Sequence, residues 1–159
     1  MDAIALGIQP LTIASERTEL ATREGTHFID LTEWIAGRVR RTGIEDGIAL
    51  VRVLHTTAAI VVNENEPLLL EDFKALLERL APAHVPYAHD DLARRRGSLL
   101  PEERSNGHSH ARALLLGDSR QLEVAEGRVV LGRWQSILLV ELDGPRTRTV
   151  TLTVIGHRR

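Results

Sequence analysis

The stretch His55-Thr56-Thr57-Ala58-Ala59 continues directly into Ile60-Val61-Val62-Asn63-Glu64-Asn65. It joins one histidine, two hydroxyls and a polar Asn-Glu-Asn cluster across a short apolar run. Residues 48–54 before it and residues 58–62 within it have the apolar content of buried β-strands. We therefore expect His55 at the end of a strand, on the rim of a sheet. Four groups from elsewhere in the chain are expected to meet it there: His89, Asn106, His110 and Gln135.

The rest of the chain predicts a single α+β domain over residues 1–159, with a large, mostly antiparallel sheet or sandwich and about three helices. Asp30 and Glu33 have the spacing of a capping box, and Gly43 is the expected stop of that helix. Pro67 opens an apolar helical repeat that ends before Pro82. A third helix is expected at 109–116, and strands at 7–15, 18–23, 48–54, 58–62, 121–125, 128–131, 135–142 and 147–155.

Composition excludes several classes of protein. The net charge of −2 and the pI of about 6.4 demand neither a nucleic-acid nor a membrane partner. The chain has no cysteine, which excludes disulfides and thiolate metal sites. No apolar run approaches the roughly 20 residues of a membrane span. Residues 1–10 lack the order of a secretory signal, so we expect a cytoplasmic protein.

Residues 83–106 are the least regular part of the chain and contain Pro86, Gly97 and Pro101. An irregular segment of this length in a compact domain is usually functional or disordered. We interpret its charge run, residues 94–104, as a solvated loop rather than a binding patch.

Seven histidines are more than a domain of this size needs for packing. Four of them lie beside small or polar residues at the ends of expected elements: His55, His89, His108 and His110. An imidazole there can bind a metal, act as an acid or base near neutral pH, or hold a phosphate. Their spacing has no local metal signature, so a hydrogen-bonded structural role stays the alternative for each. The remaining three are interpreted as surface residues: His27, His84 and His157.

Carboxylates and amides near these histidines are further candidates. Asp90 and Asp91 follow His89, and a carboxylate can fix the tautomer of an imidazole or join it on a metal. The alternative is a solvated acidic turn. The cluster Asn63-Glu64-Asn65 can equally lead into the Pro67 helix and supply its cap, an alternative that is stronger for Asn65 than for Asn63.

Two polar residues flank the apolar strand near the carboxyl end of the chain. Gln135 opens this strand and Glu141 closes it, and each needs a partner because a buried polar group left unpaired costs about 1–3 kcal/mol. Trp134 is interpreted as a core residue. Arg146 follows a tight turn, where a guanidinium can clamp a phosphate or a carboxylate, or simply face solvent.

Five motifs follow one another in the chain: His55-Thr56-Thr57-Ala58-Ala59 with Asn63-Glu64-Asn65, Tyr87-x-His89-Asp90-Asp91, Asn106-x-x-x-His110, Leu131-Gly132-Arg133-Trp134-Gln135 and Asp143-Gly144-Pro145-Arg146. In this order they resemble the YjbQ-like family, also called the secondary thiamine-phosphate synthase family. The resemblance runs from residue 47 to 156, and more loosely from residue 8. Thr57 stands where the family more often has Ser, and residues 92–105 form a longer segment that could cover the pocket.

The resemblance implies a compact α+β domain that assembles as a homotrimer, with a pocket near the subunit interface. It implies that His55, His89 and His110 are the family's histidines, so His110 is preferred to His108, which would point nearly the opposite way on one helix. The resemblance also implies a divalent metal on these three imidazoles, with zinc as the first expectation and magnesium as the alternative. The implied activity is thiamine-phosphate synthesis, which joins a pyrimidine pyrophosphate to a thiazole phosphate. The chain has no glycine-rich phosphate loop, so we expect this activity to be secondary.

The leading hypothesis is a metal-dependent enzyme that acts on a small phosphorylated or otherwise anionic metabolite. Its catalytic candidates are His55, Asp90, His110 and Glu64, and its metal ligands are His55, His89 and His110. Its candidates for binding substrate are Thr56, Thr57, Asn63, Asn106, Gln135 and Arg146. One alternative is a non-catalytic trimer that binds an anionic metabolite or a metal. Another is a purely structural polar network at the interface of the trimer.

Overall fold

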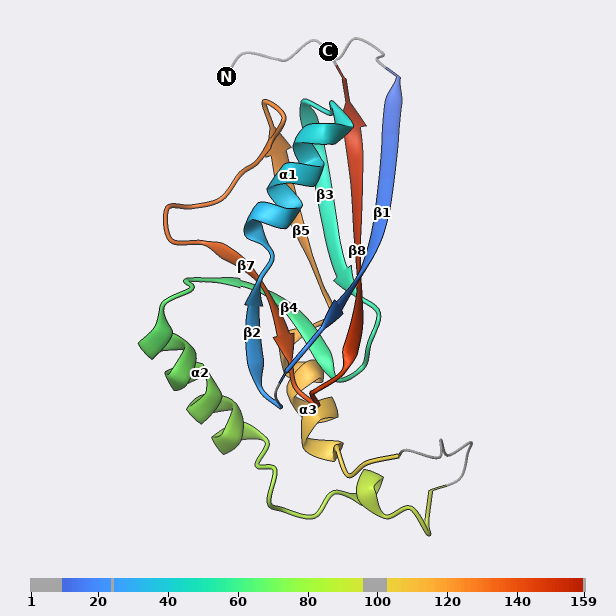
Figure 1. Ribbon diagram of the computed structural model, residues 1–159, viewed down its shortest axis with the longest axis vertical. Helices are drawn as coiled ribbons and strands as arrows, with labels where there is room; N and C mark the ends of the chain where they lie inside the picture. Colours follow the sequence, from blue (N-terminus) through green and yellow to red (C-terminus); the bar gives the residue numbers. More distant parts are fainter. Residues whose placement is uncertain (1–9, 24, 96–102, 159) are drawn as a thin grey trace, which may run out of the picture.

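The structure is a computed structural model that describes residues 10–23, 25–95 and 103–158. Its elements are, in chain order, β1 (Leu11–Ala21), β2 (His27–Asp30), α1 (Thr32–Thr42), β3 (Asp46–Val53), β4 (Ala58–Asn63), α2 (Pro67–Leu80), the 3₁₀ turn η1 (Ala88–Asp90), α3 (Gly107–Leu116), β5 (Ser119–Ala125), β6 (Arg128–Val129), β7 (Ser136–Glu141) and β8 (Thr147–His157). The prediction of an α+β domain with three α-helices is confirmed (Figure 1).

The strands form two antiparallel sheets. The large sheet has the order β1-β8-β3-β5-β6, and the small sheet has the order β2-β7-β4. The main core lies between the two sheets and α1. It includes Ile35 of α1, Val51 and Leu152 of the large sheet, and Ile60 and Leu139 of the small sheet, all of them nearly inaccessible to solvent. The alternation of residue types from which β3 and β8 were predicted therefore arises because one face of each strand packs on this core.

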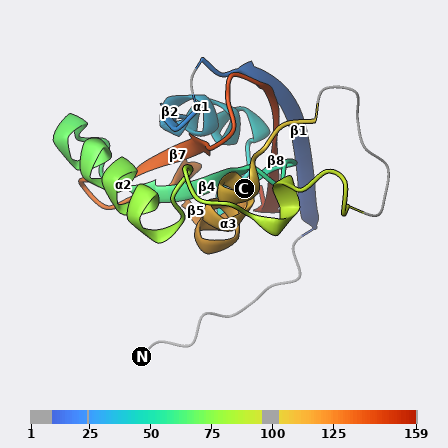
Figure 2. The same cartoon turned by 90° about the horizontal axis from the view of Figure 1, so that it is seen from below.

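A second, smaller core covers the other face of the small sheet. Val140 and Leu142 pack there with Leu77 of α2 and Ala113 of α3. Figure 2 shows α1 and α3 on opposite sides of strands β4 and β7. Because β7 is covered on both faces, its run Ile137-Leu138-Leu139-Val140 is continuous rather than alternating, and each of the four is fully buried.

The predicted helix ends are confirmed, but the predicted capping box of Asp30 and Glu33 is not, because Leu31 is the N-cap of α1 and makes no side-chain cap hydrogen bond. Asp30 Oδ1 accepts the N–H of Thr32 at 2.8 Å, and Gly43 ends α1 with a φ of 67°. The cap of α2 differs from the prediction. Glu66, not Asn65, accepts the N–H groups at the start of α2, while Asn65 Nδ2 donates to Asp30 Oδ2 at 2.9 Å.

Two predictions about the sheets are wrong. The expected strands 7–15 and 18–23 are one strand over the described residues, because β1 pairs along the whole length of β8 and its polar middle lies on an exposed edge. Trp134 is not in the core. Its side chain is 63% exposed in the turn before β7, with the guanidinium of Arg133 4.7 Å from its ring centre.

In its described residues, the loop at 83–106 contains η1 as its only helical element, and part of its charge run, residues 96–102, lies outside the described residues. No helix in the described ranges is long and apolar enough to cross a membrane. The outer face of the large sheet carries a row of exposed isoleucines in register, Ile13, Ile155 and Ile48. The homotrimer stays a prediction, and this row is a candidate contact for it.

The connection between β3 and β4 positions the site. β3 belongs to the large sheet and β4 to the small sheet, so residues 54–57 cross from one sheet to the other at their common end. His55 lies in this crossing, as expected from the strand-end position of the motif. The amino end of α3 and the turn between β7 and β8 reach the same end of the molecule (Figure 1).

Candidate functional site

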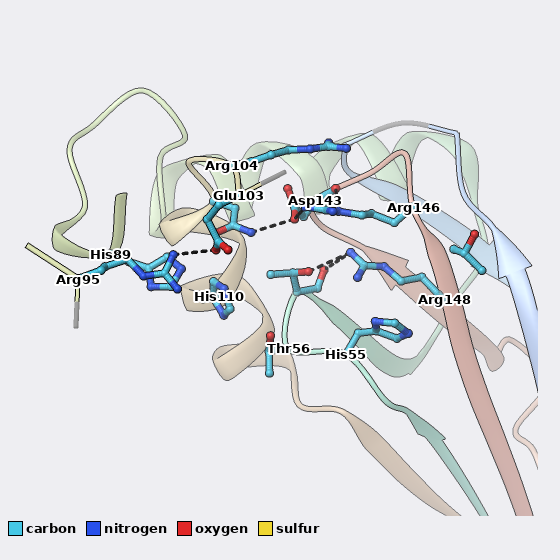
Figure 3. A pocket seen from close by; sticks show the side chains of 13 residues that line it. His55, Thr56, His89, Arg95, Glu103, Arg104, His110, Asp143, Arg146 and Arg148 are labelled. Carbon is cyan, nitrogen blue, oxygen red and sulfur yellow. Dashed lines mark hydrogen bonds and ion pairs between the residues drawn. The ribbon is translucent and has the colours of Figure 1, made fainter. Parts of the chain in front are cut away.

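A pocket of about 780 Å³ opens at this end of the sheets (Figure 3). Its volume is within the range of small-molecule sites. The crossing between the sheets, α3, the loop before it and the start of β8 all contribute side chains. The described lining residues are His55, Thr56, Thr57, His89, Arg95, Glu103, Arg104, Asn106, His110, Asp143, Arg146, Thr147 and Arg148.

The ring of His55 is held by the backbone of β8. Its Nε2 accepts the N–H of Thr149 at 2.8 Å. Burial lowers the pKa of His55 below its ordinary 6.5, and the positive charge of Arg148 lowers it further. The imidazole is therefore neutral at pH 7, with Nε2 as the acceptor, and its proton is on Nδ1. His55 thus offers a hydrogen-bond donor, not a base.

His89 and His110 are paired. Their rings meet edge to face with centroids 4.6 Å apart. Burial lowers the pKa of His110, and so does the neighbouring His89, because two adjacent imidazoles resist carrying two positive charges. Nε2 of His89 is buried and finds no hydrogen-bond partner in the described part of the chain. The neutral ring of His110 is the better candidate for a base.

A buried ion pair forms the floor of the pocket. Arg148 donates to both carboxylate oxygens of Glu141, at 2.5 and 2.6 Å, and also to the hydroxyl of Thr57 at 3.0 Å. Burial alone would raise the pKa of Glu141. Hydrogen bonds from Arg148, the N–H of Asp143 and the hydroxyl of Thr22 outweigh burial and lower it. Glu141 is the buried acid that needed a partner, and the hydroxyl of Thr57 is engaged in holding that partner.

A second network lines the wall above it. Asp143 Oδ2 accepts from Arg146 Nη2 at 2.8 Å and from Asn106 Nδ2 at 2.9 Å. These contacts fix the amide of Asn106 with its Oδ1 buried, and this oxygen has no partner among the described residues. A buried acceptor left unpaired costs about 1–3 kcal/mol, so a donor from a ligand would be favourable here.

Cations outnumber carboxylates in the lining. The described lining residues include four guanidinium groups, those of Arg95, Arg104, Arg146 and Arg148, and two carboxylates, those of Glu103 and Asp143. Counting Glu141, which neutralises Arg148 from behind the wall, still leaves an excess of positive charge. Arg104 is exposed and forms no ion pair with a residue that the structure describes. The pocket therefore favours an anion.

Asp90 has a structural position. Its Oδ1 accepts the N–H groups of Asn106 and Gly107, both at 2.9 Å, at the amino end of α3. A carboxylate is stabilising there because the free N–H groups and the helix dipole attract negative charge. Asp90 does not line the pocket, so its predicted role as a base is not supported by its placement.

Substituting Gly107 by alanine should open this corner of the site. A Cβ on Gly107 would lie 2.4 Å from Cβ of Tyr87, two residues before His89. The segment that carries His89 and Asp90 would have to move, at a cost of about 1–3 kcal/mol in the free energy of unfolding. Urea unfolding measures this. The control Gly37→Ala meets only the end of Arg40 at 3.8 Å in α1, and it should leave stability equal or slightly higher. Equal stability for both variants would contradict the close packing of Tyr87.

Three predicted site residues lie elsewhere. Antiparallel pairing sets Ala58 opposite Glu141 at the pocket end and Asn63 opposite Ser136 at the other. Five residue steps along β4 separate these ends by about 17 Å. Asn63 Oδ1 accepts the N–H of Glu64, and Gln135 Oε1 accepts the N–H of Gly132. Gln135 was expected to meet His55, Asn63 to bind substrate and Glu64 to act in catalysis. These predictions are wrong for the described chain, because this pairing sends the three residues to the far end of the small sheet.

The other histidines are less uniform than predicted. His84 is an exposed surface residue, as expected, 3.4 Å from Glu78. His27 and His157 are only half-buried overall, yet each has a buried Nδ1 without a hydrogen-bond partner in the described ranges, so the surface interpretation is wrong for both. His108 packs near Tyr87 and does not line the pocket, which supports the choice of His110.

The histidines do not present the three-ligand metal site that the sequence predicted. In the described part of the chain, no three His, Asp or Glu side chains are grouped so that they could hold a metal ion. His89 and His110 are adjacent, but Nε2 of His55 is engaged with Thr149. The described residues therefore bring two of the three imidazoles together, and the third is engaged elsewhere.

Sequence reasoning missed several lining residues: Arg95, Glu103, Arg104, Asp143, Thr147 and Arg148. Arg148 had a signal that could have found it. A glutamate at the end of a fully apolar strand requires a buried cation, and Arg148 is the next arginine but one after Glu141.

Comparisons with known proteins agree with the motifs. The family model described as "UPF0047 protein YjbQ-like" matches residues 16–157. The chain belongs to the YjbQ-like family. The resemblance inferred from the five motifs is thereby confirmed.

Relatives of the YjbQ-like family cover almost the whole chain. A UPF0047 protein of Methanothermobacter thermautotrophicus is 36% identical over 146 residues, which are 92% of this chain and 94% of the relative. YugU of Bacillus subtilis is 33% identical over 87% of this chain and 96% of its own length. The crystal structure of a YbjQ-like protein of unknown function from Sulfolobus solfataricus has a TM-score of 0.84 at 33% identity, and covers 93% of this chain and 100% of that one. These relatives show the family and the fold, and their names state no activity.

Proposed function

We propose that this protein is an enzyme that binds a small anionic metabolite, such as a phosphate ester, in the pocket at the sheet ends. The observation that carries the proposal is the composition of the pocket wall. Asn106 and His89, each with a buried polar atom that has no partner among the described residues, line a pocket in which guanidiniums exceed carboxylates. Guanidinium forks suit phosphate and carboxylate oxygens, and each charge-assisted hydrogen bond contributes about 1.5–3 kcal/mol.

The proposed roles follow from the hydrogen bonds of each residue. Arg146 and Arg104 bind the anion, and Nδ1–H of His55 donates to it. Asn106 Oδ1 accepts from a hydroxyl or amino group of the metabolite. His110, which is neutral at pH 7, takes a proton from the reacting group, either directly or through a water molecule.

The reaction named by the family resemblance, thiamine-phosphate synthesis, is the first one to assay. Both of its substrates are anions, and its leaving group is pyrophosphate, so an arginine-rich pocket suits both. The metal that the resemblance implies would lower the negative charge of the leaving group. The described residues bring together only two of the three imidazoles of such a site, and we propose that the arginines neutralise the leaving group in this chain.

Replacing His110 by alanine should reduce turnover by about 100-fold or more, the ordinary contribution of a positioned acid or base. The assay supplies phosphorylated metabolites, including the two substrates of thiamine-phosphate synthesis, and follows product by mass spectrometry. His84→Ala is the matched control, since His84 is 79% exposed and lies outside the pocket. Saturable binding without turnover in the parent protein would favour the non-catalytic binding module instead.

The pH dependence follows from the lowered pKa of His110. A base works in its neutral form, which predominates above its pKa, so turnover should stay level from pH 8 down to 7. It should fall only as the pH drops through a value below the ordinary 6.5. NMR titration of the His110 ring signals gives the same pKa independently. A midpoint above 6.5 in both measurements would contradict the burial of the ring.

A further inference from the structure

A second pocket lies on the other side of the histidines. It has a volume of about 600 Å³, and three residues line both pockets: His55, Thr56 and His110. Figure 3 shows these three residues on the side of the site away from Arg104, Asp143 and Arg146. The two pockets therefore adjoin at this shared set of side chains, and Arg95, Arg104, Arg146 and Arg148 all belong to the first pocket.

The chemistry of the second pocket is different from that of the first. Its other lining residues include the apolar side chains of Val53, Leu54, Ala58, Ala113 and Leu114. Its only charged residues in the described chain are Arg52 and Asp118, which neutralise each other at 3.1 Å on the rim. Leu54 is 40% exposed and Leu114 is 85% exposed, so apolar surface is available there. Such a pocket favours an uncharged group over an anion.

We propose that the second pocket takes an uncharged, apolar part of the same metabolite whose anionic group binds among the arginines. This inference rests on the proposed function and narrows it to a substrate class. The substrate is an anionic head, phosphate or carboxylate, attached to an apolar body. The bond that reacts lies between the two parts, beside the rings of His55 and His110, because among the described residues only these two and Thr56 line both pockets.

A homologous series of alkyl phosphates, from methyl to hexyl phosphate, tests this by calorimetric titration, with inorganic phosphate as the head group alone. Affinity for the parent protein should rise with chain length, by up to about fourfold for each methylene that is buried. The double variant Leu54→Gln/Leu114→Gln should bind inorganic phosphate as the parent does, and the rise with chain length should disappear.

The matched control is Leu68→Gln/Leu115→Gln. Leu68 is 75% exposed and Leu115 is 61% exposed, and neither lines either pocket, so the rise with chain length should persist. If the parent protein binds phosphate but its affinity does not rise with alkyl chain length, this inference is overturned and the proposed function stays intact. If affinity still rises with chain length in the Leu54/Leu114 variant, the inference is also overturned. A change in assembly state by light scattering in that variant alone overturns it too, because the surface would then be a contact between copies of the chain. If neither phosphate nor any ester binds, the proposed function fails as well.

Discussion

Replacing Arg148 by methionine should lower the free energy of unfolding by about 3–5 kcal/mol, because it leaves the carboxylate of Glu141 buried without its cation. Glu141 is fully buried, and the side chain of Arg148 is 4% exposed. The lowered pKa of Glu141 stabilises the fold at pH values above its ordinary 4.5, and this contribution is lost as the pH falls through the lowered folded value. Urea unfolding at pH 7 and near pH 4 should therefore show a smaller deficit at the lower pH.

Two controls accompany this variant. Arg52→Met removes a partner from the exposed pair with Asp118, whose side chains are 53% and 49% exposed, and should cost less than about 1 kcal/mol. The double variant Glu141→Leu/Arg148→Met removes both buried charges and should be more stable than Arg148→Met alone. If Arg148→Met lowers the free energy of unfolding no more than Arg52→Met does, the buried pair does not stabilise the floor of the pocket.

Replacing Arg146 by glutamine should weaken the binding of an anion by about 10- to 100-fold. The loss of one charge-assisted interaction is worth about 1.5–3 kcal/mol, and 1.4 kcal/mol is a factor of ten. The substitution also removes the cation from the carboxylate of Asp143, which now accepts from Arg146 at 2.8 Å, and the uncompensated negative charge would repel the ligand. Arg146→Lys should retain part of the affinity, since it keeps the charge without the guanidinium fork.

The matched control for Arg146 is Arg133→Gln. This substitution removes the same charge from the protein. Arg133 lies over Trp134, outside the pocket, so the affinity for an anion should stay within about twofold of the parent. Equal weakening in both variants would mean that the net charge of the protein, rather than the pocket, attracts the anion.

The sequence predicted the elements with a strong local signal. Pro67 and the leucine repeat fix α2, and Gly43 ends α1 with the left-handed backbone that glycine favours. β1 was the main error, because local polarity indicated a turn where pairing with the whole of β8 imposes a strand. A pairing partner more than 100 residues away in sequence leaves no trace in a local pattern.

The site was predictable only where a motif marks the end of an element. His55 and Arg146 follow strand ends or turns, and both line the pocket. Gln135 sits at a strand end of the same kind, yet it lies at the wrong end of β7, because the direction of the strand decides which end reaches the pocket. Arg148 was missed because it is a charged residue within an alternating strand. Its burial makes sense only once its ion pair with the buried Glu141 is known.

The most direct test of the anion pocket is a calorimetric titration of pyrophosphate into chelator-treated protein at low ionic strength, for the parent and for Arg146→Gln. We expect saturable binding with one site per chain in the parent, weaker binding as salt rises, and at least a tenfold loss of affinity in the variant. Binding that is absent after chelation and returns only when zinc is added would contradict it. That result would restore the three-histidine metal site as the centre of this pocket.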